Sequence, residues 1–270
     1  MSNTDWPELL LIDKPQGITS FDVIRRLRRR WHESRTRDVD EVQGATEMSE
    51  RGVCGDTMNE DSREATQKIA TSRVRAPKMG HAGTLDPLAT GLMLIGVGQG
   101  TKKLQEYLKL DKEYVAEVLI GERRTTGDME GEVTEKKEVT DSVAILQSKI
   151  ATELAEMVGT LTLPVSAYSA IKKDGVPMYK RARKAAERGE VVTKVPMREM
   201  VVHEAELTEF NGGDGRAVAT VRFHVGSGTY IRSLGEELGR RLGYPATLAA
   251  LRRTKIGDFD IKDAQTIDTL

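Results

Sequence analysis

Two long segments in which apolar and polar residues alternate constrain the fold of this chain more than any other feature. Residues 199–209 and 216–225 each carry an apolar side chain at every second position, which is typical of strands with one buried face. The run Asn211-Gly212-Gly213-Asp214-Gly215 between them predicts a tight hairpin turn. An antiparallel strand pair is therefore expected, with these side chains on its buried face: Val201, His203, Ala205, Leu207, Ala217, Ala219, Val221, Phe223 and Val225.

The remaining elements follow one another without a regular alternation of strand and helix. Ser20 is the expected N-cap of the first helix, and Gly243 is expected to end the last one. This irregular order favours the α+β class, with one domain over residues 1–270 and a mixed or antiparallel central sheet flanked by helices and loops. Apolar runs predict strands at 9–12, 91–98 and 113–120, and helical spacing predicts helices at 20–31, 101–109, 141–157 and 229–242.

The net charge of −1 hides an uneven distribution. Residues 38–64 hold nine acidic and two basic side chains, and without them 39 bases face 33 acids, a net charge of +6. The polar stretch 33–77 lacks periodicity, so an acidic insertion without regular structure is expected there. It is either an inert solvated loop or a gate that competes with phosphate for the cationic helix at Arg25 to Arg30. The body that remains is basic, as nucleic-acid binders commonly are.

A single cysteine and short apolar runs exclude several classes of protein. Cys54 has no partner in the chain for a disulfide and cannot form a multi-cysteine metal site, which favours a reducing environment. No apolar run approaches the roughly 20 residues of a membrane span. The N-terminal residues also lack the basic segment of a secretory signal. We therefore expect a cytoplasmic protein without membrane contact.

Residues 80–91 form the segment richest in reactive groups. The run Gly80-His81-Ala82-Gly83-Thr84-Leu85-Asp86-Pro87-Leu88-Ala89-Thr90-Gly91 concentrates glycines, one histidine and one aspartate directly before a buried strand. Loops held by a rigid scaffold often carry function. The residues alone leave a simpler interpretation open, in which Asp86-Pro87 makes a turn and His81 is a structural hydrogen-bonding group.

A second glycine-rich segment, Gly96-Val97-Gly98-Gln99-Gly100, raises the possibility of a dinucleotide-binding enzyme. An acidic residue, Glu117, follows some twenty residues later, as that motif requires. However, the third glycine comes one residue too early and no strand–helix–strand unit precedes it. A packing role for these glycines is favoured.

Two segments in the second half of the chain also allow two interpretations each. Gly226 to Arg232 opens a helix with Tyr230 and Arg232 in or beside its first turn, which suits an anion or is a plain helix start. Residues 165–192 are rich in Lys and Arg with tyrosines interleaved. That excursion suits RNA, because tyrosines stack on bases, or it forms an ordinary solvated face.

Taken together, blocks along nearly the whole chain resemble the TruB family of tRNA pseudouridine synthases. The resemblance implies the pseudouridine synthase fold and the isomerisation of a uridine in tRNA, at position fifty-five in the T-arm, to pseudouridine. Besides residues 80–91, the matching blocks are Leu11-Ile12-Asp13-Lys14-Pro15-Gln16-Gly17-Ile18-Thr19-Ser20, Asp111-Lys112-Glu113-Tyr114, Tyr168-Ser169-Ala170-Ile171-Lys172, Gly228-Thr229-Tyr230-Ile231-Arg232 and Leu251-Arg252-Arg253.

The resemblance also implies roles for individual residues. Asp86 corresponds to the essential aspartate, which attacks the sugar or the base, or removes a sugar proton. Arg232 corresponds to the arginine that pairs with it and aims it. Tyr114 corresponds to the tyrosine that stacks on the flipped target base and accepts the proton lost at its carbon. The other matches are His81, which holds the rearranged RNA loop, Tyr230 and Leu251, which line the pocket, and Lys14, whose role is structural.

The resemblance implies no metal and no organic cofactor, because nothing is oxidised and no group is donated. The expected partner is the T-arm stem-loop of tRNA, bound by a monomer that needs no protein partner. The chain departs from the family pattern in its insertion at 33–77. It also ends soon after Ile261, where many relatives carry a C-terminal RNA-binding domain that is expected to be absent here.

Two alternatives to a stand-alone enzyme stay open. One is a non-catalytic RNA-binding or RNA-folding protein on the same scaffold. The other is a synthase that depends on a guide RNA to select its uridine. The presence of Asp86, Tyr114 and Arg232 argues against the first, because a pure RNA binder has no physical need for an aspartate near phosphate.

Overall fold

The computed structural model describes residues 6–34 and 75–269, apart from residues 170, 174, 189, 191, 193, 194 and 214. Nearly all of the expected acidic insertion at 33–77 lies outside the described residues. The predictions about that insertion therefore stay predictions.

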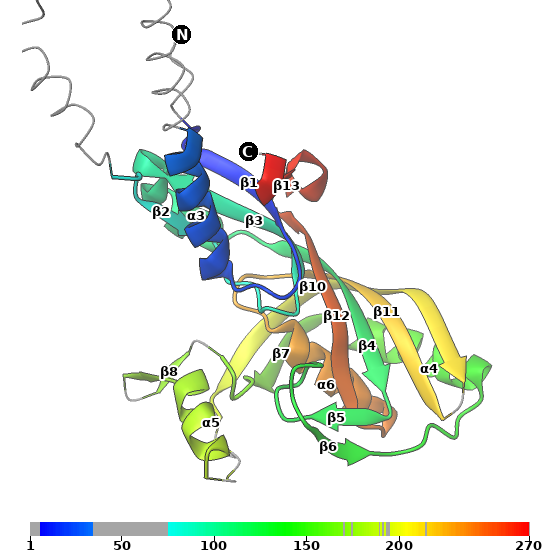
Figure 1. Cartoon of the computed structure of the whole chain (residues 1–270). Coiled ribbons are helices and arrows are strands. Elements are labelled where there is room, and N and C mark those ends of the chain that lie inside the picture. Colours follow the sequence, from blue (N-terminus) through cyan, green and yellow to red (C-terminus); the bar gives the residue numbers. More distant parts are fainter. Residues whose placement is uncertain are drawn as a thin grey trace, which may run out of the picture.

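A ten-stranded mixed sheet runs through the middle of the molecule (Figure 1). Two strand pairs, β1 with β14 and β12 with β3, are parallel, and the other pairs are antiparallel. The predicted α+β class with a mixed sheet is confirmed. Along the sheet the strands are β14 (Gln265–Thr266), β1 (Leu9–Lys14), β3 (Thr90–Val97), β12 (Ala246–Ile256), β4 (Lys112–Ile120), β11 (Arg216–Val225), β10 (Met197–Gly213) and β7 (Gly159–Pro164), while β2 (Met79–His81) pairs with β3 and β13 (Phe259–Asp260) with β12.

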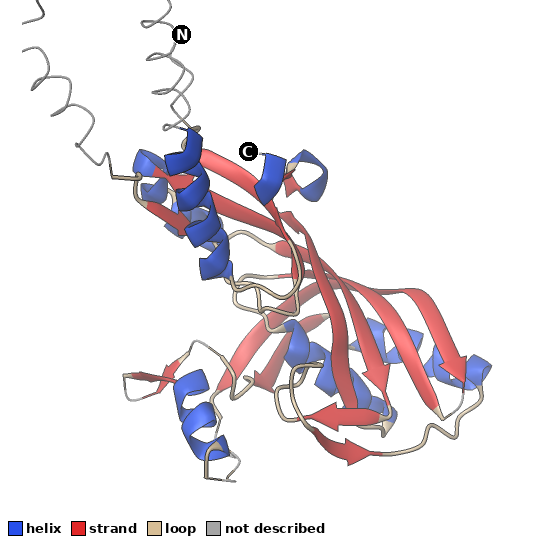
Figure 2. Cartoon of the chain, in the orientation of Figure 1, coloured by secondary structure: helices blue, strands red, loops and turns tan. Residues whose placement is uncertain are grey.

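Helices cover one face of this sheet along much of its length (Figure 2). They are helix 20–34, α4 (Val143–Glu156) and α6 (Ile231–Leu242), whose apolar side chains share one buried cluster with the strands. A smaller cluster covers the other face near β1 and β3, where α3 (Leu104–Leu108) packs on leucines of both strands. Short 3₁₀ turns follow at η1 (Gly98–Lys102), η2 (Ile261–Asp263) and η3 (Ile267–Thr269).

The predicted end of the last helix is confirmed in detail. Gly243 follows α6 in the left-handed conformation with φ +79°, and Arg240 and Arg241 occupy the last turn. Close to that end, any side chain at Gly239 would collide with Ala246 of β12. The helix can therefore approach the sheet closely, which fixes where Arg232, at its other end, is presented.

Two hairpins stand apart from the main sheet. One pairs β5 (Glu122–Arg124) with β6 (Val133–Lys136). The other pairs β8 (Lys172–Lys173) with β9 (Val176–Pro177) and leads into α5 (Met178–Ala186). The second hairpin and α5 make up most of the basic excursion predicted at 165–192, and Figure 1 shows them projecting from the body of the molecule.

Two local predictions are wrong. A bulge between Val202 and Glu204 inserts an extra residue in β10, so Val201 and His203 point to the opposite side from Ala205 and Leu207. The N-cap of the first helix is Thr19 rather than Ser20. The Thr19 hydroxyl accepts a hydrogen bond from the Asp22 amide at 3.1 Å, and the Thr19 amide donates to the Asp22 carboxylate at 2.9 Å.

No helix within the described ranges 6–34 and 75–269 is long and apolar enough to cross a bilayer.

Candidate active site

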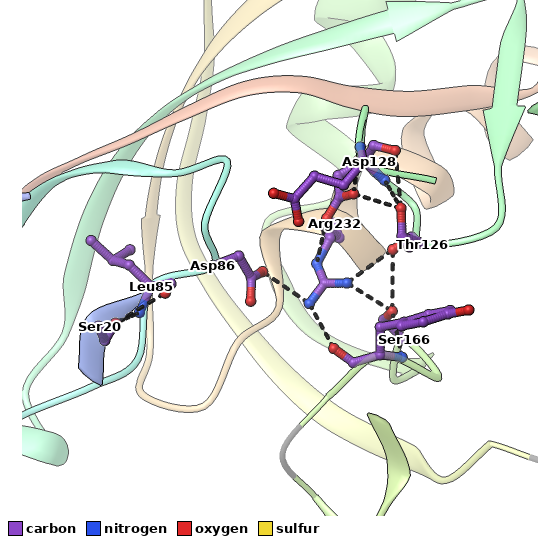
Figure 3. A network of polar contacts seen from close by, with 9 residues as sticks. Ser20, Leu85, Asp86, Thr126, Asp128, Ser166 and Arg232 are labelled. Atoms are coloured by element: carbon purple, nitrogen blue, oxygen red, sulfur yellow. Dashed lines mark hydrogen bonds and ion pairs between the residues drawn. The ribbon is translucent and has the colours of Figure 1, made fainter. Parts of the chain in front are cut away.

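The loop between β2 and β3, residues 82–89, carries Asp86 and is fastened on both sides of it. The Ser20 hydroxyl accepts a hydrogen bond from the Leu85 amide at 2.8 Å and donates one to the Leu85 carbonyl oxygen at 2.9 Å. After Asp86, the Gly17 amide donates to the Pro87 carbonyl oxygen at 2.8 Å. Ser20 was expected to cap its helix, and it instead ties that helix to the loop (Figure 3).

Two buried basic residues, Lys14 and Arg253, donate hydrogen bonds to carbonyl oxygens of the same loop. The Lys14 ammonium donates to the carbonyl oxygens of Ala89 at 2.6 Å and Pro87 at 3.3 Å. The Arg253 guanidinium donates to Gly83 at 3.2 Å and to Leu92 at 2.7 Å. Both residues are almost completely buried. Burial lowers the pKa of Lys14 to about 8. Together with Ser20, these two residues hold the loop at Gly83 and Leu85, before Asp86, and at Pro87 and Ala89, after it.

Arg232 contacts residues from three other parts of the chain (Figure 3). Its Nη2 lies 2.9 Å from Oδ2 of Asp86, and its Nε lies 3.6 Å from Oδ2 of Asp128. Nη1 donates to the Thr126 carbonyl oxygen and to the Ser166 hydroxyl, each at 2.9 Å. The guanidinium is buried, whereas the Asp86 side chain is 38% exposed. A fixed fork of this kind holds a solvent-accessible carboxylate in one orientation.

Asp128 is itself fixed by the turn that carries it. The Thr126 hydroxyl donates to the Asp128 carboxylate at 2.5 Å, and the Glu130 amide donates to the same oxygen at 3.1 Å. Asp128 is buried. Arg232 therefore sits between two carboxylates, one buried and held by its own turn and one exposed on a clamped loop.

The two loops that meet at Arg232 also border a cavity of about 410 Å³. Gln16, Gly17 and Leu88 line it on the side of the Asp86 loop, and Met129 and Glu130 line it on the side of the Asp128 turn. Burial, followed by the charges of Asp128 and Asp86, raises the pKa of Glu130. Two of the lining residues, Leu88 and Glu130, lie two positions along the chain from Asp86 and Asp128, so the cavity opens near the Asp86–Arg232 pair.

The sequence matches a family model along more than half of its length. Residues 70–231 match the model described as "TruB family pseudouridylate synthase (N terminal domain)". The chain belongs to the TruB family.

Curated relatives of the TruB family resemble this chain over nearly all of it. It is 37% identical over 262 residues to "tRNA pseudouridine synthase B" of Leifsonia xyli subsp. xyli, a match that covers 97% of this chain and 71% of the relative. It is 40% identical over 225 residues to the protein of the same name from Stutzerimonas stutzeri, covering 82% and 69%. By family, the chain is thus a pseudouridine synthase, an isomerase.

Solved structures agree on the fold. The chain is similar to a component of an H/ACA ribonucleoprotein bound to a substrate RNA containing 2′-deoxyuridine, with a TM-score of 0.53 and 22% identity, covering 96% of this chain and 51% of that one. It is similar to a chain of a Cbf5-Nop10-Gar1 complex with a TM-score of 0.54 and 23% identity, covering 96% and 53%. The chain thus spans about half the length of these structures.

The other positions that match TruB motifs are buried or half-buried. Tyr114 on β4 and Leu251 on β12 are buried on the face that the helices cover. Tyr230 directly precedes α6, and burial raises the pKa of its hydroxyl. His81 ends β2, where burial is the main cause that lowers the pKa of its imidazole and Nδ1 has no hydrogen-bond partner among the described residues.

Three participants in the site were not identified from the sequence: Asp128, Ser166 and the clamp formed by Arg253. A signal for the first was present, because Asp128 stands between two glycines in Thr125-Thr126-Gly127-Asp128-Met129-Glu130-Gly131, as a turn that presents a carboxylate requires. Among the described residues, no group of three or more His, Cys, Asp or Glu side chains is arranged to hold a metal ion.

Proposed function

We propose that this chain converts a uridine of tRNA to pseudouridine, namely the uridine at position fifty-five in the T-arm. The observation that carries the proposal is the 2.9 Å pair between Asp86 and Arg232. It places an oriented, accessible carboxylate beside a cavity in a chain of the TruB family. The curated relatives bear the name tRNA pseudouridine synthase B, which supports tRNA as the substrate class.

The reaction explains why a single oriented carboxylate is useful. The bond between N1 of uracil and C1′ of ribose breaks, the base turns while it is held, and a bond forms between C5 and C1′. The proton on C5 is lost and N1 gains a proton, so the product is an isomer of the substrate. Asp86 stabilises or captures the electron-deficient sugar or base during this exchange, and Arg232 keeps its carboxylate aimed.

Further residues that match TruB motifs would hold the turning base. Tyr114 stacks on the base and accepts the proton from C5, and Leu251 on the neighbouring strand completes the apolar wall. Tyr230 closes the pocket at the start of α6. His81 holds the rearranged T-loop once the target nucleotide has left the stack, which costs a few kcal/mol in unstacking.

The basic excursion supplies a first RNA-binding surface for this function. α5 carries Lys180, Arg181, Arg183 and Lys184, and the Arg183 guanidinium lies 5.8 Å from the ring centre of Tyr179. A second cavity, of about 390 Å³, is lined by Arg181, Lys184 and Arg188 together with apolar side chains and Glu190. Cations interleaved with a tyrosine suit the RNA backbone and its bases.

The proposal is tested by mapping pseudouridine in RNA that has been incubated with the wild-type chain or with the Asp86→Asn variant. The substrate is an unmodified T-arm stem-loop transcript, incubated with protein alone, without guide RNA, protein partner or added cofactor. The wild-type chain is expected to form pseudouridine at the T-arm uridine, and Asp86→Asn to form none while retaining RNA affinity within about threefold. Activity of Asp86→Asn would contradict the mechanism.

The same assay separates the alternatives. A chain that binds the transcript but never modifies it would be an RNA-binding or RNA-folding protein. A chain that modifies RNA only when a guide RNA is added would be a guide-dependent synthase. Modification of the bare transcript excludes both.

A further inference from the structure

The cationic helix 20–34 has no role in the proposed reaction, yet it begins beside the loop 82–89 that carries Asp86. The hydroxyl of Ser20, in its first turn, is bonded to both backbone groups of Leu85, the residue before Asp86. The helix therefore has a fixed position relative to the reacting carboxylate. Figure 3 shows Ser20 and Leu85 meeting beside Asp86.

The charged side chains of this helix are mostly basic. Residues 20–34 contain five arginines and two acidic residues. The side chains of Arg25 and Arg29 are 68% and 76% exposed. Their carboxylate partners, Asp22 and Glu33, lie three and four residues away on the same helix. Ion pairs near the surface contribute about 0–1 kcal/mol, so they oppose binding of a phosphate to the same guanidinium only weakly.

An exposed aromatic side chain lies on the same face. Phe21 is 60% exposed, more than any other large apolar side chain among the described residues. Because residues four apart are neighbours on a helix surface, Phe21, Arg25 and Arg29 follow one another along one side of the helix, outward from the loop that carries Asp86. Burial in the core does not explain Phe21, since Val23, Ile24 and Leu27 form the buried side of this helix.

We propose that Phe21, Arg25 and Arg29 form a second RNA-binding surface, on which Phe21 stacks on a base next to the target uridine and the arginines bind backbone phosphates leading away from it. The proposal rests on the proposed function for its choice of RNA. Cations with an aromatic group are the combination that binds RNA backbone and unstacked bases. Arg25 and Arg29 are one turn apart, about 6 Å along the helix, so they contact successive parts of one strand.

The test measures binding of the T-arm stem-loop to the full chain between 50 and 200 mM salt. A phosphate contact contributes about 0.7 to the slope of log affinity against log salt for single-stranded RNA. Arg25→Gln/Arg29→Gln is therefore expected to flatten the slope by about 1.4, so that the variant loses about sevenfold less affinity than the wild type over this fourfold salt range. Phe21→Ala is expected to weaken binding at least about fivefold with the wild-type slope, because stacking is not ionic.

Arg240→Gln is the matched control. Arg240 is 67% exposed and paired with an acid three residues away, as Arg25 is, but it lies at the far end of α6 from Arg232. It is expected to keep the wild-type affinity and slope. A double arginine variant whose slope equals that of Arg240→Gln, or a Phe21→Ala variant with wild-type affinity, would overturn the proposal.

Parallel pseudouridine mapping distinguishes this failure from failure of the proposed function. If the wild type modifies the transcript and the arginine variant keeps its slope, only the second surface is refuted. If the wild type binds with the expected slopes but forms no pseudouridine, the enzymatic proposal fails and the RNA surface stands. A wild type that binds acidic polypeptides or anionic vesicles but not the RNA would refute the surface as an RNA site.

Discussion

Replacement of Arg253 by methionine tests whether this arginine mainly stabilises the fold or mainly positions Asp86 through the loop 82–89. Arg253 is 1% exposed and donates to the carbonyl oxygens of Gly83 and Leu92, on either side of Asp86. Among the described residues it has no carboxylate partner. Its hydrogen bonds therefore go only to neutral acceptors.

Two opposing terms set the effect on stability. Arg253→Met leaves two carbonyl oxygens without this donor, at about 1–3 kcal/mol each. It also removes a buried charge that no counter-ion compensates, which returns several kcal/mol of desolvation free energy. The terms largely cancel, so the free energy of unfolding is expected to fall by only about 1–2 kcal/mol and the melting temperature by about 2–6 °C.

The effect on catalysis is expected to be much larger. Without the clamp, the loop relaxes and Asp86 moves, and a displacement of about 1 Å at a reacting group costs about 100-fold in rate. Single-turnover pseudouridine formation by Arg253→Met, measured well below its melting temperature, should fall about 100-fold. The adjacent Arg252→Met is the control, because Arg252 is 44% exposed and paired with Asp13. A rate for Arg253→Met within threefold of that of Arg252→Met would refute the reasoning.

A separate observable tests the charge of Arg253 rather than its geometry. Burial first, and the Arg253 charge second, lower the pKa of His81. In Arg253→Met the pKa of His81, followed by NMR, should rise. In Arg253→Lys the charge remains but the two-pronged donor is lost, so the pKa should stay low while the rate still falls.

Two further results are expected. Asp128→Asn removes one of the two carboxylates that hold Arg232 but leaves the hydrogen bonds of Arg232 to Thr126 and Ser166. The rate of pseudouridine formation should therefore fall about tenfold, equivalent to about 1.4 kcal/mol, while RNA affinity is retained. A rate equal to that of the wild type would show that Asp128 does not help to position Arg232. Folding lowers the pKa of Lys14 from 10.5 to about 8, so between these values the unfolded chain binds more protons and this lysine makes stability rise with pH. Subtracting the unfolding free energy of Lys14→Met from that of the wild type should give a difference that increases from pH 8 to 10.5, and a flat difference would contradict the assignment.

Local pattern was sufficient to predict most of the scaffold. Alternating apolar residues located β11 within its observed bounds, and helical spacing with Gly243 located the end of α6. The pattern failed in β10, because an inserted residue after Val202 reverses which side chains face the core on its two sides. A bulge is a feature of how two strands pair, and strict alternation along one strand does not predict it.

The candidate site depended on information that spacing does not hold. Asp86 and Arg232 lie 2.9 Å apart although 146 positions separate them, and only the family resemblance brought them together in advance. Asp128 and Ser166 were missed because an aspartate in a glycine-rich turn and a serine in a loop have many ordinary roles. Both meet Arg232 only because of how the segments around β5, β6 and β7 are joined to the sheet.

The distribution of cations suggests a division of labour around Asp86. An aspartate that works on RNA must approach a polyanion, which repels it. Lys14, Arg232 and Arg253 are buried, so salt screens their interactions with the loop only weakly. Arg25 and Arg29 of helix 20–34 and Lys180, Arg183 and Lys184 of α5 are exposed, so salt weakens their binding to phosphate. RNA affinity thus depends on exposed cations whose interactions weaken with salt, whereas the position of Asp86 depends on buried cations whose interactions salt screens only weakly.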